Sequence, residues 1–306
     1  MKYDMVIIGA GPAGISAAVY AKSRGLNVLL LEKKQVGGLI GNVSTVTHYA
    51  GIIEKETGAT FANRLKEQAL GAGVEIVYEE VMEVELTADV KKIKTDKSVY
   101  EAAAVILANG TTPRKLDIPG EAALSGNGIG LNAARDGKRY EGKNIYVVGG
   151  ADGAIKEAIY LAQFAKKLTI IHFEEKLGAI AEFMRKLDQL PNLEVRLNTR
   201  LTGVFGDDHV ERLELTSEKT AEKEIIEDDG CGIFVYAGSI PNTGLYTELK
   251  SEDGFLTVNA RMETEIPGVY AAGDICVKQV RQVATAAADG AIAAINACNY
   301  IKSKSK

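Results

Sequence analysis

The sequence has no tryptophan, only three cysteines and no long apolar run. Its longest purely apolar stretch is 102–108, far shorter than the roughly 18–20 residues that a membrane-spanning helix needs. Basic residues are also few. The 36 Lys and Arg face 41 Asp and Glu, and the net charge of −5 gives no general cationic field for nucleic acid or anionic lipid. We therefore expect neither a nucleic acid nor a membrane as a partner.

The cysteines do not form a recognisable site. Cys231, Cys276 and Cys298 lie far apart, with no CxxC pair and no spacing typical of metal ligands. The apolar segment at 5–8 is too short to be the core of a secretory signal. The sequence thus predicts a chain of the reducing cytoplasm with no metal site.

What is present is an ordinary globular composition that is rich in glycine. The 306 residues are 46% hydrophobic and 25% charged, which excludes a disordered chain, and 32 of them are glycine. At about 150 residues per domain, this length allows two domains or one large α/β domain. Many glycines with no tryptophan favour the tight turns of an α/β fold over an aromatic binding surface.

The first part of the chain has the pattern of a dinucleotide-binding unit. An apolar strand at 6–8 leads into a glycine-rich turn, and small apolar residues at helical spacing follow it. Gly9 allows the tight turn, Gly11 lets the backbone approach a pyrophosphate, and Gly14 lets the helix pack close to the strand. We expect the helix N-terminus to face the phosphates with its unpaired N–H groups. Glu32 ends the next apolar strand, where a carboxylate accepts hydrogen bonds from an adenosine ribose.

A similar pattern begins 140 residues after the first, at Gly149. An apolar strand at 145–148 precedes this glycine, a helix is expected at 156–166, and the next apolar strand is 168–171. Ala151 stands where the phosphate-approach glycine belongs, and its methyl group crowds a pyrophosphate. Two such units indicate an α/β protein with two Rossmann-like domains.

Seven motifs then occur in order along nearly the whole chain. They are Gly9–Gly14, Gly37-Gly38, Tyr49-Ala50-Gly51, Ala108-Asn109-Gly110, Gly238 with Pro241-Asn242-Thr243, Ala271-Ala272-Gly273-Asp274, and Arg281-Gln282. Together they resemble the low-molecular-weight thioredoxin reductase family of flavoproteins, class II of the pyridine nucleotide-disulphide oxidoreductases. The resemblance implies a three-layer ββα sandwich in which a second Rossmann-like domain is inserted in the first. It also implies a FAD-binding domain at 1–112 plus 243–306, an inserted NAD(P)-binding-like domain at 113–242, and a homodimer.

The resemblance also implies which residues contact the FAD. Asp274 is expected to hold the ribityl or pyrophosphate region, and Arg281 with Gln282 to face the flavin ring. His48 is a candidate to hydrogen-bond the ring or to move a proton, and an ordinary structural histidine is the alternative. The full expected set is Gly9, Gly11, Pro12, Ala13, Gly14, Glu32, Lys33, Gly38, Leu39, Ile40, His48, Ala108, Asn109, Gly110, Gly273, Asp274, Arg281, Gln282 and Val283.

The family's redox disulphide is missing from this chain. The family carries CxxC followed by Asp-Gly early in the inserted domain, and here Asn132 and Arg135 stand in place of the two cysteines. Neither an amide nor a guanidinium exchanges thiols, so reduction of thioredoxin by the family's own mechanism is not expected. Asp136 remains and resembles the family's proton donor, which makes it a catalytic candidate together with His48 and Cys276. Cys276 is expected near the cofactor, and a small buried core residue is the alternative.

The second nucleotide site departs from the family as well. The resemblance places an arginine clamp for a 2′-phosphate after the strand at 168–171, but the chain has His172, Phe173 and Glu174 there. Carboxylates repel a phosphate at close range, so NADPH is disfavoured, whereas Glu174 can accept from the ribose of NADH. Two alternatives stay open: a domain that binds no pyridine nucleotide, and a second flavin or nucleotide stacked on Phe173. The candidate residues are Gly149, Gly150, Ala151, Asp152, Gly153, His172, Phe173 and Glu174.

The sequence therefore predicts a FAD-dependent oxidoreductase that passes electrons from a donor to an external acceptor without a CxxC of its own. NADH and a ferredoxin-like protein are the expected donors. One alternative is an enzyme similar to the ferredoxin or flavodoxin–NAD(P)H reductases of thioredoxin reductase type, which share this resemblance and lack the cysteine pair. Another alternative is a non-catalytic flavoprotein whose redox state or bound nucleotide is sensed by a partner.

Overall fold

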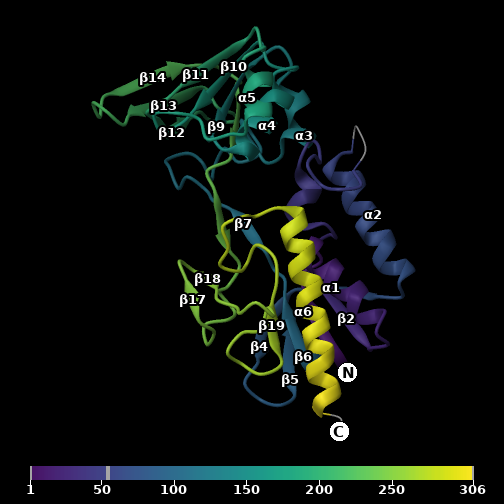
Figure 1. Cartoon of the computed structure of the whole chain (residues 1–306). Helices are drawn as coiled ribbons and strands as arrows, with labels where there is room; N and C mark the ends of the chain where they lie inside the picture. Colours follow the sequence, from purple (N-terminus) through teal and green to yellow (C-terminus); the bar gives the residue numbers. More distant parts are fainter. Residues whose placement is uncertain (1, 53–55, 305–306) are drawn as a thin grey trace. The chain divides into compact units, whose positions relative to one another are not determined.

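The computed structural model describes residues 2–52 and 56–304 (Figure 1). The chain forms two compact units, one made of residues 1–112 and 240–306 and the other of residues 113–239. The second unit is therefore an insertion in the first. The chain passes between them through strands β7 (Thr111–Pro113) and β16 (Ser239–Pro241), which pair with each other. The returning segment of the first unit begins at residue 240.

The sheet of the first unit has strand β1 (Lys2–Ile8) near its centre. Parallel strands flank it, and Ile7 is paired with Leu30 on one side and with Ile106 on the other. All three side chains are fully buried, which explains why these strands are continuous apolar runs. The strand order is β3 (Glu75–Tyr78), β2 (Val28–Glu32), β1, β6 (Val99–Leu107), β5 (Lys91–Thr95) and β4 (Val81–Glu85), with β19 (Val269–Ala271) also paired to β6.

Helices cover one face of this sheet. Helices α1 (Pro12–Lys22) and α6 (Val283–Lys304) lie side by side (Figure 1). Their backbones approach so closely that a Cβ at Gly290 would be only 2.1 Å from the Ala13 carbonyl oxygen. The Ser16 hydroxyl of α1 also donates to the Ala287 carbonyl of α6 at 2.7 Å. Helix α2 (Gly58–Gly71) and the short helix η1 (Gly38–Asn42) belong to the same unit, as does the hairpin of β17 (Ser251–Glu252) and β18 (Phe255–Leu256). Apolar residues on the two faces of the sheet belong to two separate cores.

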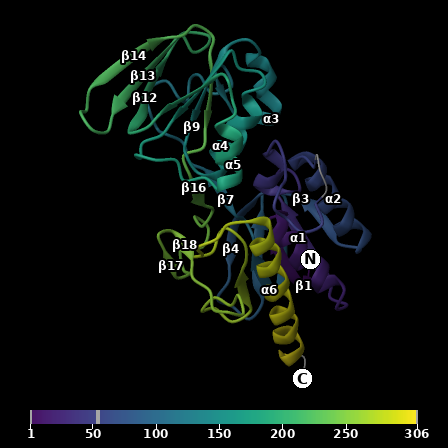
Figure 2. The ribbon, with the colours of Figure 1, turned by 45° about the horizontal axis from the view of Figure 1, so that its top comes forward.

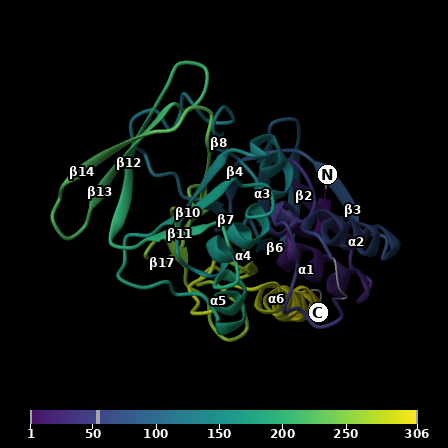
Figure 3. The same cartoon turned by 90° about the horizontal axis from the view of Figure 1, so that it is seen from above.

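The second unit has a sheet of five parallel strands. Their order is β11 (Leu193–Arg196), β10 (Lys167–Ile171), β9 (Asn144–Val148), β15 (Gly232–Val235) and β8 (Ile129–Gly130). One face packs on helices, of which the main ones are α3 (Ala133–Asp136), α4 (Asp152–Leu161) and α5 (Ala181–Leu187). The other face packs on an antiparallel meander of β12 (Thr199–Phe205), β13 (Arg212–Ser217) and β14 (Lys223–Glu227), which Figures 2 and 3 show from two directions. Meander, sheet and helices make three layers, so the predicted α/β sandwich is confirmed.

No helix within residues 2–52 and 56–304 is long and apolar enough to cross a membrane. Within the same residues, no group of three or more His, Cys, Asp or Glu side chains is arranged to hold a metal ion.

Candidate functional site

The first glycine loop joins β1 to α1 and has room for a ligand at one position. A Cβ at Gly9 (φ +102°) would lie 2.4 Å from the Ala108 carbonyl oxygen, and one at Gly14 would lie 1.8 Å from the Gly9 carbonyl oxygen. Both glycines are therefore required by close backbone packing. A Cβ at Gly11, by contrast, would have no described atom within 4 Å. Gly11 is also the N-cap of α1 and no side chain caps this helix, so its first N–H groups can bind a phosphate.

Glu32 is fixed against this loop. One carboxylate oxygen accepts from the Ala10 amide at 3.0 Å and the other accepts from the Lys34 amide at 2.9 Å. An ionised carboxylate has about four acceptor positions, so Glu32 can also accept from a ribose hydroxyl. Lys33, predicted beside it, extends to an exposed ion pair with Glu80 at 3.8 Å.

The segments next predicted to contact FAD lie close to the glycine loop. Pro12 and Ala13 are the first residues of α1, and Gly38 begins η1, where a Cβ would lie 3.4 Å from the Gly11 Cα. Leu39 and Ile40 follow in η1, and the Leu39 side chain is exposed. The structure thus brings Gly38 beside the loop at residues 9–14.

The Ala108-Asn109-Gly110 segment follows β6 and is held by the protein itself. Asn109 accepts a hydrogen bond from the Tyr246 hydroxyl at 2.7 Å, and its carbonyl accepts from the Asn242 side chain at 2.9 Å. Tyr246 is buried, and burial raises the pKa of its hydroxyl well above the ordinary range. The side chain of Asn109 is therefore a structural anchor, and the Ala108 amide and the Gly110 carbonyl are also hydrogen-bonded within the protein, to the Ile8 carbonyl and the Asn242 amide.

Asp274 carries a buried acceptor that no described residue satisfies. It follows β19, and its Oδ1 atom is buried without a hydrogen-bond partner among the described residues. Burial is the main cause that raises the pKa of Asp274. The preceding Gly273 is fixed by its amide, which donates to Asp289 at 3.0 Å, and Asp289 is also ion-paired with Lys278. An unsatisfied buried acceptor of this kind fits a ligand hydroxyl, such as one on the ribityl chain of FAD.

Arg281 carries a second buried atom that lacks a hydrogen-bond partner among the described residues, its Nε. Its guanidinium carbon lies 4.0 Å from the centre of the Phe255 ring, and Nη1 donates to the Lys278 carbonyl at 3.1 Å. The buried Nε has no partner among residues 2–52 and 56–304. Gln282 is exposed just before α6, and Val283 is the first residue of that helix. Asp274 and Arg281 thus supply an acceptor and a donor that suit FAD, so the residues present fit this cofactor.

Two of the catalytic candidates, His48 and Cys276, lie in different surroundings. His48 is exposed and its Nδ1 lies 3.1 Å from the Thr47 hydroxyl. Cys276 is buried, and burial raises the pKa of its thiol to about 12, so the thiol is neutral at physiological pH. Reactive cysteines are partly exposed and ionise readily. These observations favour the alternative for Cys276, a packed core residue.

The third catalytic candidate, Asp136, is clamped as an anion. Arg135 stands next to it and donates from Nε and Nη2 at 2.8 Å each. The amides of Leu131 and Asn132 also donate to the carboxylate, and Asp136 is only 3% exposed. The Arg135 hydrogen bonds are the largest cause that lowers the pKa of Asp136. This geometry opposes the proton-donor role that the resemblance implies, because the carboxylate stays ionised at neutral pH.

The second glycine loop joins β9 to α4 and is partly occupied by its own chain. A Cβ at Gly149 (φ +133°) would lie 2.5 Å from the Tyr236 carbonyl oxygen, so this turn also requires glycine. The Gly150 carbonyl accepts from the Gly178 amide at 2.9 Å, and the Asp152 side chain accepts from the Ile180 amide at 2.8 Å. Asp152 is therefore engaged in holding the segment after β10.

Two further positions of this loop remain open to a ligand. Ala151 is the N-cap of α4, and no side chain caps the helix there. A Cβ at Gly153 would have no described atom within 4 Å. The helix N-terminus can therefore bind a phosphate, with the Ala151 methyl group as its main restriction.

The residues after β10 form a group with Arg200 of β12 and with Glu218. His172 is 6% exposed, and its Nε2 lies 3.2 Å from a Glu174 carboxylate oxygen. The Phe173 ring is exposed, and the Arg200 guanidinium carbon lies 4.4 Å from its centre. Arg200 in turn donates to Glu218 at 2.7 Å. Arg200 and Glu218 come from β12 and from just after β13, and no local motif in the sequence links them to Phe173.

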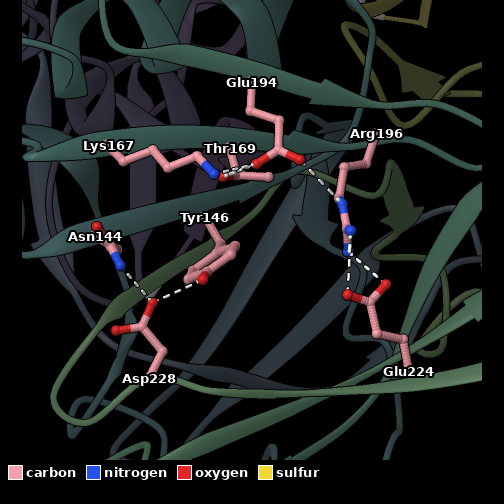
Figure 4. Close-up of polar contacts among 8 residues, drawn as sticks. All are labelled: Asn144, Tyr146, Lys167, Thr169, Glu194, Arg196, Glu224 and Asp228. Atoms are coloured by element: carbon pink, nitrogen blue, oxygen red, sulfur yellow. Dashed lines mark hydrogen bonds and ion pairs between the residues drawn. The ribbon is translucent and has the colours of Figure 1, made fainter.

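A separate polar seam lies between the parallel sheet and the meander of the second unit (Figure 4). Asp228 accepts from the Tyr146 hydroxyl and from the Asn144 side chain at 2.7 Å each. Arg196 bridges Glu194 and Glu224 with N–O distances of 3.2 and 2.9 Å. Every partner in this seam is satisfied by another side chain, so we interpret it as the bond between two layers rather than as a ligand site.

Comparisons with known proteins agree with this architecture. A family model described as pyridine nucleotide-disulphide oxidoreductase matches residues 3–290. A thioredoxin reductase of Peptoclostridium acidaminophilum is 39% identical over 306 residues, which cover 98% of this chain and 97% of the relative. The crystal structure of Lactococcus lactis thioredoxin reductase (FR conformation) has a TM-score of 0.94 and 33% identity, covering 98% of this chain and 99% of that one. A ferredoxin-flavin thioredoxin reductase from Clostridium acetobutylicum has a TM-score of 0.54 and 30% identity, covering 100% and 99%.

The residues of the first unit fit the FAD cofactor that this family implies. A thioredoxin reductase-like family implies FAD and a pyridine nucleotide, and the first unit has an open loop, a ribose acceptor and an unsatisfied donor and acceptor that fit FAD. The chain belongs to the pyridine nucleotide-disulphide oxidoreductase family and is a FAD-dependent oxidoreductase with the thioredoxin reductase fold.

Proposed function

We propose that this enzyme transfers electrons from its flavin directly to an external acceptor, without a dithiol relay of its own. The observation that carries the proposal is that Asn132 and Arg135 stand where the resemblance places the two redox cysteines, with Arg135 hydrogen-bonded to the neighbouring Asp136. Neither Arg135 nor Asn132 can form a disulphide. The acceptor must therefore take its electrons from the flavin rather than from a thiolate of this segment.

The remaining cysteines do not offer a substitute. Cys231, Cys276 and Cys298 are free and buried. Burial is the main cause that raises the pKa of each thiol, to about 12 for Cys276. The thiolate is the species that attacks a disulphide, so neutral buried thiols cannot relay electrons at a useful rate.

The protein's part in the reaction is to hold and orient the cofactor. When bound, FAD supplies the two-electron chemistry of its isoalloxazine ring. The N-terminus of α1 would bind the pyrophosphate and Glu32 the adenosine ribose. Asp274 would accept from the ribityl chain, and Arg281 would donate from Nε. We propose residues 1–112 plus 243–306 as the FAD-binding domain, residues 113–242 as the pyridine nucleotide domain, and a homodimer as the assembly.

For the electron donor we propose NADH over NADPH. Glu174 stands after β10, where an acidic residue accepts from the 2′-hydroxyl of NADH and opposes the 2′-phosphate of NADPH. A ferredoxin-like protein is the second candidate donor. Its support is the 30% identity to a protein named ferredoxin-flavin thioredoxin reductase.

The test is anaerobic reduction of the purified, FAD-loaded protein, followed by flavin absorbance. NADH, NADPH and reduced ferredoxin are compared as donors, and a quinone or ferric acceptor is then added. We expect rapid bleaching with NADH or ferredoxin and rapid reoxidation by the acceptor, both unchanged after the reduced protein is alkylated with iodoacetamide. Loss of turnover on alkylation would contradict the proposal. A flavin that is never reoxidised at a useful rate would instead favour a redox sensor.

A further inference from the structure

The exposed aromatic ring of Phe173, just after the end of β10, lies against the guanidinium of Arg200 from β12. Phe173 is 45% exposed, and the Arg200 guanidinium carbon is 4.4 Å from the ring centre. Arg200 is itself held by Glu218, whose carboxylate accepts from Nε at 2.7 Å. A cation–π contact and an ion pair at such exposed positions contribute little to the stability of a fold. The arrangement therefore needs another explanation.

Backbone hydrogen bonds hold this group in place. The Thr199 amide donates to the His172 carbonyl at 2.9 Å, and the Asn198 amide donates to the Glu174 carbonyl at 3.0 Å. The Glu218 amide donates to the Asn198 carbonyl at 2.7 Å. The ring, the guanidinium and the carboxylate are thus positioned by the backbones of three neighbouring segments. A surface fixed in this way loses little conformational entropy when it binds a flat ligand.

The charges of the group discriminate against one class of ligand. An arginine near the end of the second strand of a Rossmann unit accommodates a 2′-phosphate. Here the arginine in reach is already neutralised by Glu218, and Glu174 adds an exposed carboxylate on the same strand end. A ligand with a free ribose hydroxyl meets an acceptor, whereas a ligand with a 2′-phosphate meets an anion.

We propose that Phe173 and Arg200 form the platform on which the adenine of NADH stacks, and that Glu218 sets the preference against NADPH by holding and neutralising Arg200. This inference rests on the proposed use of a pyridine nucleotide donor. Phe173 contributes the flat apolar surface, and Arg200 adds a planar cation that stacks on aromatic rings. Glu218 is a positioning residue, because it acts only through Arg200.

The experiment measures binding of NADH and NADPH to the FAD-loaded full chain by titration calorimetry under anaerobic conditions. We expect NADH to bind at least about tenfold more tightly than NADPH. Phe173→Ala should weaken NADH binding about tenfold, and Phe173→Tyr, which keeps the ring, should restore it. Glu218→Gln frees Arg200 and should strengthen NADPH binding about fivefold with less than about twofold change for NADH.

A matched control exists in the same meander. Arg212 lies with its guanidinium carbon 5.7 Å from the centre of the Phe205 ring, so Arg212→Gln removes a similar contact elsewhere and should change neither dissociation constant. Tighter binding of NADPH than of NADH by the unmodified protein would overturn the inference, as would an unchanged NADH/NADPH ratio in Glu218→Gln. Absence of binding by either dinucleotide would also overturn it. Direct flavin electron transfer would survive that result if reduced ferredoxin still bleached the flavin.

Discussion

The two units differ in how they treat their charged groups, while a ring nitrogen without a described partner, His172 Nδ1, is also buried in the second unit. In the first unit, Asp274 and Arg281 keep buried atoms without a partner among the described residues. In the second unit, the charged side chains at the predicted cysteine position and beside the predicted nucleotide site are paired within the protein. Arg135 is paired with Asp136, and Arg200 with Glu218. Unsatisfied buried polar atoms are costly unless a ligand completes them. The comparison teaches that the first unit is built around a resident cofactor, whereas the second has exchanged reactive groups for fixed ion pairs.

The two glycine loops differ in the same sense. The first keeps a glycine at position 11, where a side chain would meet only a ligand. The second has Ala151 at that position, and the neighbouring Asp152 is used to hold the Ile180 amide. The first loop therefore admits a pyrophosphate at closer range than the second.

The largest expected effect is that of a substitution at Gly14, which the first loop needs for packing and not for ligand contact. Gly14→Ala places a Cβ 1.8 Å from the Gly9 carbonyl oxygen, so the helix must move away from the strand. We expect the variant to lose about 3 kcal/mol of unfolding free energy and to purify without FAD. Urea unfolding of the apoprotein and the flavin-to-protein absorbance ratio measure the two effects.

Gly11→Ala is the matched control for that variant. Its Cβ would meet no described atom within 4 Å, so the apoprotein should unfold within about 0.5 kcal/mol of the parent. FAD should nevertheless bind at least about tenfold more weakly, because the methyl group meets the pyrophosphate. Equal FAD binding by Gly11→Ala and the parent would remove the contrast between the two loops.

A second prediction tests the fixed ion pair of the inserted unit. Asp136→Asn should lower the unfolding free energy by about 2 kcal/mol at pH 7, because a buried anion with four donors is replaced by an amide. The pKa of Asp136 is lowered in the folded protein, so its stabilisation is present above the ordinary pKa of about 4 and is lost as the pH falls through the folded value. The difference between variant and parent should therefore shrink below about pH 4.

Arg135→Gln provides the control for the acid-range measurement. Arg135 is 62% exposed, so its removal should cost only about 1 kcal/mol. A pH-independent difference between Asp136→Asn and the parent would show that the carboxylate is not held as an anion.

The smallest expected effect is a gain in NADPH affinity when the second glycine loop is made more similar to the first. Ala151→Gly removes the methyl group at the helix N-terminus, and Glu174→Arg replaces a carboxylate by a cation at the end of β10. The double variant should bind NADPH about tenfold more tightly than the parent, measured by calorimetry. No gain in affinity would count against the placement of the second nucleotide site.

Local patterns predict the two Rossmann-like units and the first glycine loop with Glu32. Gly9, Gly11, Gly14 and Glu32 follow directly from the apolar strands that flank them, and the structure places Glu32 against the loop. Alternating apolar runs and glycine turns predict the two Rossmann-like units, whereas the three-layer sandwich is what the family resemblance implies, and the structure confirms it.

The contacts that could not be predicted come from distant segments or from rotamers. Arg200 reaches Phe173 from a strand 27 residues further along, and only the pairing of the meander brings Glu218 beside it. The clamp on Asp136 depends on the Arg135 side chain turning back on its neighbour, which no spacing specifies. No local pattern links Asn109 to the distant Tyr246 hydroxyl, from which its side chain accepts; its contact with the cofactor stays a prediction.

The most direct test of the central claim is to count the electrons that each FAD-loaded protein accepts. The fully oxidised protein is titrated anaerobically with dithionite until the flavin and any disulphide are reduced. The double variant Asn132→Cys with Arg135→Cys, which restores a cysteine pair at the spacing of CxxC, serves as the comparison. We expect the natural chain to take up two electrons per FAD and the variant four, because a disulphide adds one two-electron couple. Four electrons per FAD in the natural chain would contradict electron transfer without a dithiol relay.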